Sequence, residues 1–238
     1  MEKNPAGMSD EHNLNAFTGR ALYYAKARPN YPEGAVLHIR GLAPRGAAFA
    51  DIGAGTGKFT VQLASYGNRI FAVEPNADMR GQLTLAVAGY QNVIVSSGTA
   101  EATGLDCGCA DVVVCAQSLN KFDLDAFKKE CLRIGREGLV VAALYNRTSG
   151  KLENTSQYDR STGAFFTNPE VREFPNPVCF TRESWLLYHL SMDGVPMENE
   201  TGHAKYAAEL DAAFDRESAD GILLHELTTV VYSERIKR

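Results

Sequence analysis

The sequence predicts an α/β protein in which helices cover both faces of a doubly wound, mostly parallel sheet. Three observations support this prediction. Apolar, strand-like runs alternate with helical patterns from residue 47 to residue 144. Two of these runs, 112–114 and 139–142, are apolar at every position, as expected for strands that are covered on both faces. A glycine-rich turn joins the first strand to the helix that follows it.

Two helices are expected before the sheet, at 17–27 and 32–42. The second begins at Pro32, which the first turn of a helix tolerates because its backbone nitrogen would be unpaired there in any case. Asp123 is the expected N-cap of a later helix. The remaining elements alternate along the chain. They are strands at 47–52, 69–74, 92–96, 110–116 and 137–144, with helices at 57–66, 77–88 and 124–135 between them.

Beyond Leu144 the pattern changes. Residues 145–176 are rich in Asn, Thr, Ser and Asp, and we interpret them as a long excursion with one helix near 154–160. The elements expected after it are a strand at 177–180, helices at 185–192 and 205–214, and a final strand at 227–232. The regions expected are a flexible N-terminus (1–15), a core with N-terminal lid helices (16–146), a substrate-covering cap over the carboxyl edge of the sheet (147–226), and a final strand that returns to the core sheet (227–238).

Composition argues against several classes of protein. The 238 residues include 24 basic and 29 acidic side chains, a net charge of −5 that gives no support for a nucleic-acid-binding surface. No apolar run reaches the ~18 residues that a membrane span needs. The five cysteines are odd in number and no secretory signal is recognised, so we expect reduced thiols and a cytoplasmic protein. Cys107 and Cys109 lack a second ligand pair at zinc spacing, so no metal site is expected.

The most informative motif is the glycine-rich turn after the first strand. It carries Gly53, Gly55 and Gly57, and Asp51 precedes it at the end of the strand. Glycine is needed where φ is positive or where a ligand lies against bare backbone, so the turn predicts a nucleotide-like ligand over the start of the next helix. The dinucleotide fingerprint G-x-G-x-x-G would require glycine at position 58, where Lys58 stands. An acid such as Asp51 repels a pyrophosphate but suits a ligand that carries an ammonium group.

The Asp-x-Gly-x-Gly-x-Gly sequence of residues 51–57 resembles motif I of the class I S-adenosylmethionine (SAM) dependent methyltransferases. The resemblance covers about residues 16–146 well and the final strand more loosely. It implies a seven-stranded, Rossmann-like sheet, SAM as the cofactor and S-adenosylhomocysteine (SAH) as the product. The residues then expected to bind the cofactor are Asp51, Gly53, Ala54, Gly55, Gly57, Glu74, Pro75, Met79, Thr99, Ala100, Glu101 and Gln117.

Glu74 is the second acid of this pattern, at the end of the adjacent strand. Its carboxylate can accept hydrogen bonds from both ribose hydroxyls of an adenosine, each worth about 1.5–3 kcal/mol. The structural alternative is an N-cap or an acid in the first turn of the next helix, favoured by the helix dipole. Met79 is expected either against the face of the adenine or in the protein core.

Other contacts to the cofactor are expected from the ends of the next two strands. Thr99 and Ala100 should place their backbone near the edge of the adenine. Glu101 either accepts a hydrogen bond from the exocyclic amine or faces solvent. Gln117, directly after the fourth strand, should form the wall beside the methionine half of the ligand.

The resemblance extends to an N-terminal segment that contains Phe17, Tyr24, Arg28 and Tyr31. In the family, a helix of this kind closes over the cofactor, and its tyrosine and arginine face the methionine portion or the substrate. We therefore expect Tyr24, Arg28 and Tyr31 to line the substrate pocket.

The chain departs from its relatives after the fourth strand, where Asn120-Lys121-Phe122 replaces the His-Trp-Phe that many of them carry. Asn120 can orient a substrate through hydrogen bonds but cannot act as a base at pH 7. The role of the missing histidine therefore cannot be carried over to this chain.

Three further residues are candidates for orienting or deprotonating a substrate. Tyr145 and Asn146 follow the fifth strand, and His203 lies in a polar run that is expected to form a mobile lid. His189 lies in an apolar helical stretch and is expected to pack in the core instead. No residue is assigned as catalytic.

These features predict transfer of the sulfonium methyl of SAM to an O, N or S nucleophile of a small molecule, by in-line displacement and mainly through positioning. A base is needed only for nucleophiles that are protonated at neutral pH. The alternatives are a catalytically silent SAM-binding sensor or partner subunit, and a nicotinamide-dependent oxidoreductase. The missing third glycine and Asp51 count against the oxidoreductase.

Overall fold

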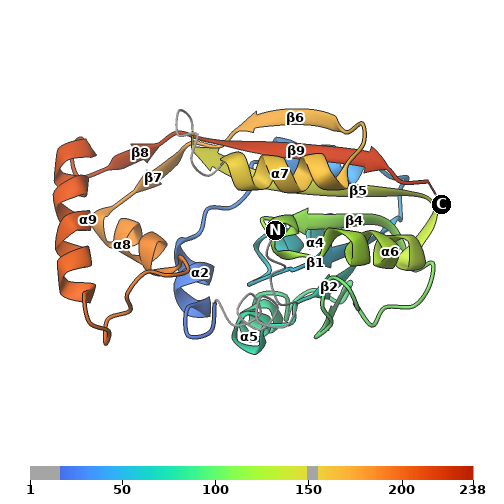
Figure 1. The fold of residues 1–238 in the computed structure, drawn as a ribbon, viewed down its shortest axis with the longest axis horizontal. Helices are drawn as coiled ribbons and strands as arrows, with labels where there is room; N and C mark the ends of the chain where they lie inside the picture. Colours follow the sequence, from blue (N-terminus) through green and yellow to red (C-terminus); the bar gives the residue numbers. More distant parts are fainter. Residues whose placement is uncertain (1–16, 149–154, 238) are drawn as a thin grey trace, which may run out of the picture.

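The structure, a computed structural model, describes residues 17–148 and 155–237. Its main sheet has seven strands: β1 (Ala48–Ile52), β2 (Arg69–Val73), β3 (Val93–Ser96), β4 (Ala110–Ala116), β5 (Gly135–Thr148), β6 (Glu170–Pro175) and β9 (Leu227–Arg235). Their order is β3-β2-β1-β4-β5-β9-β6 (Figure 1). The first five strands pair in parallel, β9 is antiparallel to β5, and β6 is antiparallel to β9. The predicted mostly parallel, seven-stranded sheet is therefore confirmed.

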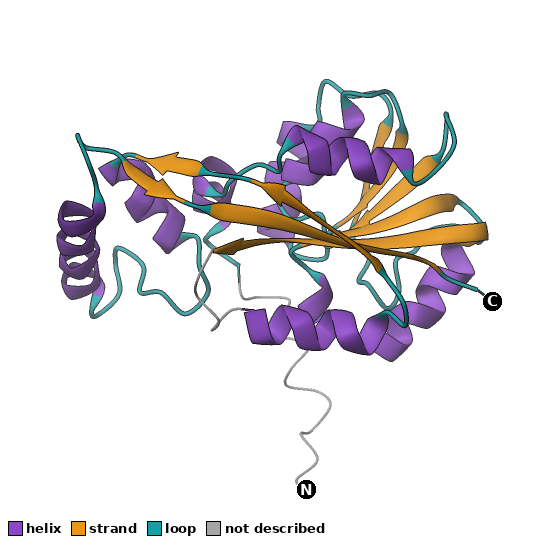
Figure 2. Ribbon diagram, turned by 90° about the horizontal axis from the view of Figure 1, so that it is seen from above, coloured by secondary structure: helices purple, strands orange, loops and turns teal. Residues whose placement is uncertain are grey.

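Helices cover both faces of this sheet (Figure 2). On one face, apolar side chains of α3 (Glu33–Gly41), α4 (Lys58–Ala64) and α5 (Ala77–Ala86) pack against the strands. On the other face, the packing helices are α6 (Leu124–Ile134) and α7 (Thr155–Phe165). Successive residues of a strand point to opposite faces of the sheet, so Phe49 of β1 packs against the α4 side and Ala50 against the α6 side. Because both faces are covered, apolar residues are favoured at every position of the central strands.

The carboxyl ends of the parallel strands meet at one edge of the sheet. Ile52 of β1 pairs with Val73 of β2, and Ala116 of β4 pairs with Leu144 of β5. The segments that leave these strands therefore lie side by side. In open α/β sheets ligands bind at this edge, at the point where neighbouring strands connect in opposite directions. Here that point lies between β1 and β4.

A smaller lobe lies beyond this edge. It contains a two-stranded antiparallel sheet of β7 (Val178–Phe180) and β8 (Leu223–His225), with α8 (Arg182–Leu190) and α9 (His203–Glu217) between these strands in the sequence (Figure 1). Helix α2 (Ala21–Ala27) packs against α8 of this lobe and against α5 of the core. The guanidinium of Arg20 donates to the carbonyl oxygens of Leu190 at 3.0 Å and Val195 at 2.5 Å.

The helix expected near 154–160 is present as α7, but the rest of the long excursion expected over 145–176 was wrong. In the structure β5 continues to Thr148, α7 covers the sheet, and β6 is an edge strand of the main sheet. The expected cap at 147–226 is thus divided, because its first part builds the core and only 178–225 forms the smaller lobe. Strand β6 was not predicted because most of its side chains are exposed, so its sequence, Glu-Val-Arg-Glu-Phe-Pro, lacks the apolar pattern of the buried strands. The N-terminus expected to be flexible, 1–15, lies outside the described residues.

No helix in the described part of the chain is both long enough and apolar enough to cross a membrane.

Candidate functional site

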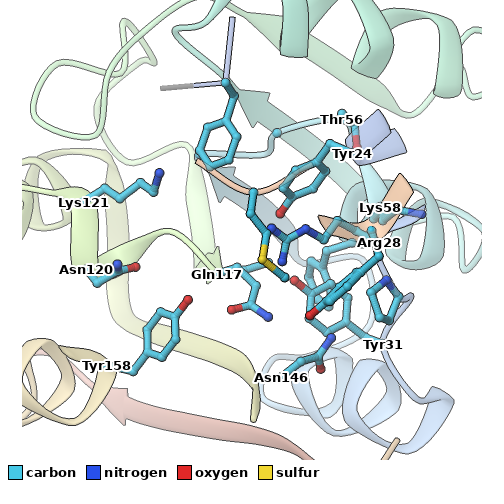
Figure 3. Close-up of a pocket in the computed structure, with 18 of the residues that line it drawn as sticks. Tyr24, Arg28, Tyr31, Thr56, Lys58, Gln117, Asn120, Lys121, Asn146 and Tyr158 are labelled. Carbon is cyan, nitrogen blue, oxygen red and sulfur yellow. The ribbon is translucent and has the colours of Figure 1, made fainter. Parts of the chain in front are cut away.

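Two adjoining cavities lie at the carboxyl edge of the sheet. We call them the Glu74 cavity, of about 490 Å³, and the Arg28 cavity, of about 580 Å³. Both are within the usual size range of small-molecule sites, ~300–1,000 Å³. Figure 3 shows the Arg28 cavity. The residues that line both cavities, and so form their common wall, are Phe17, Tyr24, Gly53, Gly55, Ala116, Gln117 and Lys121.

The glycine turn serves packing at one end and the cavities at the other. A side chain at Gly57 would clash with the core, since an added Cβ would lie 2.6 Å from Cδ1 of Leu83. Gly55 has a φ of +59°, and an added Cβ there would meet only Cε of Met79, at 3.5 Å. Gly55 therefore presents bare backbone to open space, as a close-fitting ligand requires.

Glu74 is held at the wall of its cavity by the backbone. Its Oε2 accepts a hydrogen bond from the Gly55 amide at 2.8 Å, and its Oε1 accepts one from the Asn76 amide at 2.9 Å. Burial raises the pKa of this carboxyl, while the two backbone hydrogen bonds lower it. Each carboxylate oxygen keeps a further lone pair for a ligand hydroxyl. The N-cap of α5 is Asn76, whose side chain accepts from the Met79 amide at 3.0 Å, so Glu74 is not needed for that role.

Most of the residues expected to bind the cofactor line these cavities. Met79 is 3% exposed, so it combines the two roles considered for it, since it is buried and also borders the Glu74 cavity. Glu101 accepts a hydrogen bond from the Asp123 amide at 3.0 Å. The expected residues that line one or both cavities are Gly53, Ala54, Gly55, Glu74, Pro75, Met79, Thr99, Ala100, Glu101 and Gln117.

Asp51 and Gly57 are the two expected cofactor residues that line neither cavity. Asp51 is fully buried, and its Oδ2 accepts a hydrogen bond from Oγ1 of Thr60 at 2.5 Å. Its Oδ1 has no hydrogen-bond partner among the described residues. Burial raises the pKa of Asp51 to about 7, against the Thr60 hydrogen bond, which lowers it. The structure therefore places this acid between β1 and α4, where it holds the helix to the strand.

Five of the expected substrate-pocket residues line the Arg28 cavity: Tyr24, Arg28, Tyr31, Asn120 and Asn146. The guanidinium of Arg28 lies 5.1 Å from the ring centre of Tyr24 and 5.0 Å from that of Tyr188. Its Nε donates to Oγ of Ser191 at 2.8 Å. Arg28 thus connects α2 to α8 across the mouth of the cavity.

Tyr145 and His203 do not line either cavity. Successive strand residues point to opposite faces, so Asn146 faces the cavity while Tyr145 lies in the core with its ring centre 4.1 Å from that of Tyr158. His203 begins α9 of the smaller lobe, where its Nδ1 lies 3.1 Å from the carbonyl oxygen of Pro196.

His189 packs as expected, with its ring centre 4.3 Å from that of Trp185. Its Nδ1 lies 2.9 Å from the hydroxyl of Tyr206, and burial lowers its pKa to about 4.

Sequence reasoning missed several residues that line the Arg28 cavity. Tyr158 comes from α7 and Tyr188 from α8, two helices whose approach to the cavity is set by the tertiary fold. Lys121 was noted only as a departure from the family pattern. The sequence offered a signal for it, since Lys121 directly follows the candidate Asn120 in the short 3-10 helix η1 (Leu119–Lys121) after β4. The other charged lining residues that were missed are Lys58, Arg147 and Asp193.

Within the described residues, no group of three or more His, Cys, Asp or Glu side chains is placed to hold a metal ion.

Comparison with known proteins finds similarity to methyltransferases over part of the chain. A family model described as a methyltransferase domain matches residues 50–142. An uncharacterized methyltransferase-like protein of Schizosaccharomyces pombe is 33% identical over 140 residues, which are 56% of this chain and 54% of that protein. The chain spans about half the length of the curated relatives it matches.

Solved structures share the fold. A candidate type II methyltransferase of Anaeromyxobacter dehalogenans aligns with a TM-score of 0.65 at 22% identity, covering 87% of this chain and 97% of that one. An N-methyltransferase of Haemonchus contortus, in complex with SAH, aligns with a TM-score of 0.57 at 15% identity, covering 97% of this chain and 60% of that one. Residues 50–142 of the chain thus match a methyltransferase domain, and the chain shares the fold of solved methyltransferase structures.

Proposed function

We propose that the protein transfers the methyl group of SAM to an O, N or S nucleophile of a small molecule. The observation that carries this proposal is the pair of cavities that share the glycine turn and Gln117 as a common wall. One cavity has a fixed carboxylate, Glu74, at its wall, and the other is bordered by hydrogen-bonding side chains. A two-part ligand that spans the wall would present its reactive centre to the second cavity.

The Glu74 cavity suits the adenosine half of the cofactor. Glu74 would accept hydrogen bonds from the ribose hydroxyls through the lone pairs that the backbone leaves free. Met79 and Ala100 supply apolar surface for the adenine. Bare backbone at Gly55 allows close approach of the remaining half, beside Gln117. Under this proposal, Asp51 acts on the cofactor only through the turn that it helps to position.

Positioning is the main contribution that these residues would make to the reaction. When bound, SAM supplies an electrophilic methyl group, so the protein must hold the nucleophile in line with it and exclude water. Such positioning supplies roughly 7–11 kcal/mol. Helices α2 and α8, joined through Arg28 and Ser191, close one side of the cavity. Among the described residues, the lining of the Arg28 cavity includes no histidine, in keeping with a mechanism that depends on positioning.

The acceptor is proposed to be a small molecule. The Arg28 cavity has room for one at about 580 Å³, and the net charge of −5 disfavours a nucleic-acid acceptor.

Calorimetric titration with SAM, SAH and NAD tests the proposal. We expect micromolar binding of both adenosyl ligands and no binding of NAD. Release of SAH from SAM, in the presence of a mixture of small-molecule nucleophiles, would then establish transfer. Binding of NAD, or a folded protein that binds neither adenosyl ligand, would overturn the proposal.

A further inference from the structure

The Arg28 cavity is positively charged within an acidic protein. Its lining includes Arg28, Lys58, Lys121 and Arg147, while the one acidic residue in the described lining is Asp193. The whole chain carries a net charge of −5. The concentration of cations is therefore a local feature of this cavity and not a property of the surface in general.

Three of these cations, Arg28, Lys58 and Lys121, have no carboxylate partner within 4 Å among the described residues. Arg28 contacts Ser191 and the two tyrosine rings, and the ammonium of Lys121 lies 3.9 Å from the ring centre of Phe17. Burial lowers the pKa of Lys121, and the charge of Arg28 lowers it further, against the effects of Asp193 and Glu74. Arg28 and Lys121 therefore act on the same space.

Arg147 brings a third cation to this space. Its Nη2 donates to Oδ1 of Asp159 at 2.9 Å and also to the hydroxyl of Tyr232. Its buried Nε has no hydrogen-bond partner among the described residues. This Nε is buried and therefore not itself open to a ligand, so Arg147 contributes to the cavity as a lining cation that is already paired with Asp159.

The cofactor brings one carboxylate that can pair with one of these cations, but it leaves the net positive charge of the site in place. SAM carries a sulfonium and an ammonium against one carboxylate, so its binding adds one positive charge. Cations removed from water need a counter-charge, because their desolvation is costly when they stay unpaired. Asp193 is the one acidic side chain in the described lining, so a neutral or cationic acceptor leaves the cations in excess, whereas an anionic acceptor balances them.

The lining also limits the nucleophile. Burial raises the pKa of Tyr24, Tyr31 and Tyr158, so these phenols stay protonated near pH 7 and act as hydrogen-bond donors. Among the described residues, no histidine lines this cavity to take a proton. A carboxylate needs no such base, because its ordinary pKa of about 4 leaves it ionised.

We propose that the acceptor is a small molecule with at least two carboxylates, and that one of them receives the methyl group. This inference rests on the proposed function and specifies its substrate class. Arg28 and Lys121 hold the acid through charge-assisted hydrogen bonds, and the charge of Arg147 adds to the attraction. A lone pair of the carboxylate oxygen forms the new C–O bond as the S–CH₃ bond breaks, and its electron pair goes to sulfur. The products are a methyl ester and neutral SAH, with no proton released.

The test compares ligands of similar size and different charge on the SAH-bound protein. Succinate and citrate are titrated beside the neutral succinamide, the dication of 1,4-diaminobutane, and glycerol 3-phosphate. We expect the carboxylic acids to bind at least about tenfold more tightly than the neutral diamide and the dication, and glycerol 3-phosphate shows whether the site takes a phosphate instead. With SAM in place of SAH, we expect mass spectrometry to detect a methyl ester of at least one acid.

A charge-removing variant locates the interaction. Lys121→Gln should weaken binding of the acids at least about tenfold more than it weakens binding of SAH. The matched control is Lys129→Gln, at an exposed position of α6 outside both cavities, which should change neither. The comparison of ligands on the unmodified protein remains decisive even if Lys121→Gln does not fold.

The outcomes separate the two proposals. SAH binding with no preference for the acids, or with binding of glycerol 3-phosphate alone, overturns this inference and leaves the proposed function intact. Failure of the folded protein to bind SAH overturns the proposed function and this inference together.

Discussion

The two cavities are built in different ways. The Glu74 cavity is formed largely by residues close to strand ends, in the segments 53–55, 74–79 and 99–101, and its carboxylate is fixed by backbone amides. The Arg28 cavity is formed by side chains from α2, the end of β5, α7 and α8, which are far apart in the sequence. Local sequence therefore specifies the Glu74 cavity, whereas tertiary packing assembles the Arg28 cavity.

The largest expected effect comes from filling the common wall. Gly55→Val places a branched side chain at a φ of +59°, on the surface that we assign to the cofactor. We expect SAM affinity to fall by at least about 100-fold, measured by calorimetry, because both backbone strain and a steric block act there. Gly104→Val is the control, since Gly104 has a φ of +72° with no atom near an added Cβ. If both variants retain SAM binding, the turn does not contact the cofactor.

A smaller effect is expected from the carboxylate itself. Glu74→Ala removes the acceptor of two ribose hydrogen bonds, so SAM affinity should fall by about 2–4 kcal/mol, or roughly 30- to 1,000-fold. The variant also frees the amides of Gly55 and Asn76, so thermal unfolding should be recorded beside each titration. Glu137→Ala, at an exposed position of β5, serves as the control. An unchanged affinity in folded Glu74→Ala protein would refute the ribose assignment.

The sequence predicted the Glu74 cavity because its parts are determined locally. Gly53, Gly55 and Gly57 specify the turn after β1, and Glu74 is placed by its position directly after β2. The direction of a buried side chain is harder to predict, and Asp51 was expected at the ligand but bonds to Thr60 inside the protein. Of the adjacent candidates Tyr145 and Asn146, only one can face the cavity, and the one-residue register of β5 decides which.

The Arg28 cavity was predicted only through its N-terminal helix. Tyr158 could not be placed because α7 follows a segment without clear periodicity, and its position depends on packing against α6 and the sheet. His203 was expected near the substrate because its segment is polar, but α9 belongs to the smaller lobe. Residues contributed by distant segments give no spacing pattern in the sequence that would group them.

A variant beside Arg28 tests whether the two cavities can be perturbed separately. Ser191→Ala removes the hydroxyl that accepts from Nε of Arg28 at 2.8 Å. We expect succinate binding to the SAH-bound protein to weaken by about fivefold, the equivalent of one modest hydrogen bond, while SAH affinity stays within twofold. Calorimetry measures both, with Ser65→Ala as an exposed control. Equal losses for succinate and SAH would show that the two cavities are not separable.

The smallest effect on binding is expected at Asp51, which lines neither cavity. Its pKa is about 7 in the folded protein, against an ordinary value of 3.8. Between these two pH values the folded protein keeps a proton on Asp51 that the unfolded chain has released. The contribution to stability is full below pH ~4 and is lost as the pH rises to ~7. Asp51→Asn should abolish this pH-dependent loss of unfolding free energy, which amounts to a few kcal/mol. It should leave the affinity for SAM nearly unchanged. Denaturant unfolding at pH 4, 5.5 and 7 measures the loss; identical pH profiles for the variant and the unmodified protein would contradict the assignment.

The most direct test of the account is a crystal structure of the protein with SAH. We predict the ribose hydroxyls within hydrogen-bonding distance of Glu74, the adenine beside Met79 and Ala100, and the homocysteine half beside Gly53 and Gln117, with the Arg28 cavity left open to an acceptor. An adenosine bound away from Glu74, or a homocysteine half that fills the Arg28 cavity, would contradict the division of the site into a cofactor half and an acceptor half.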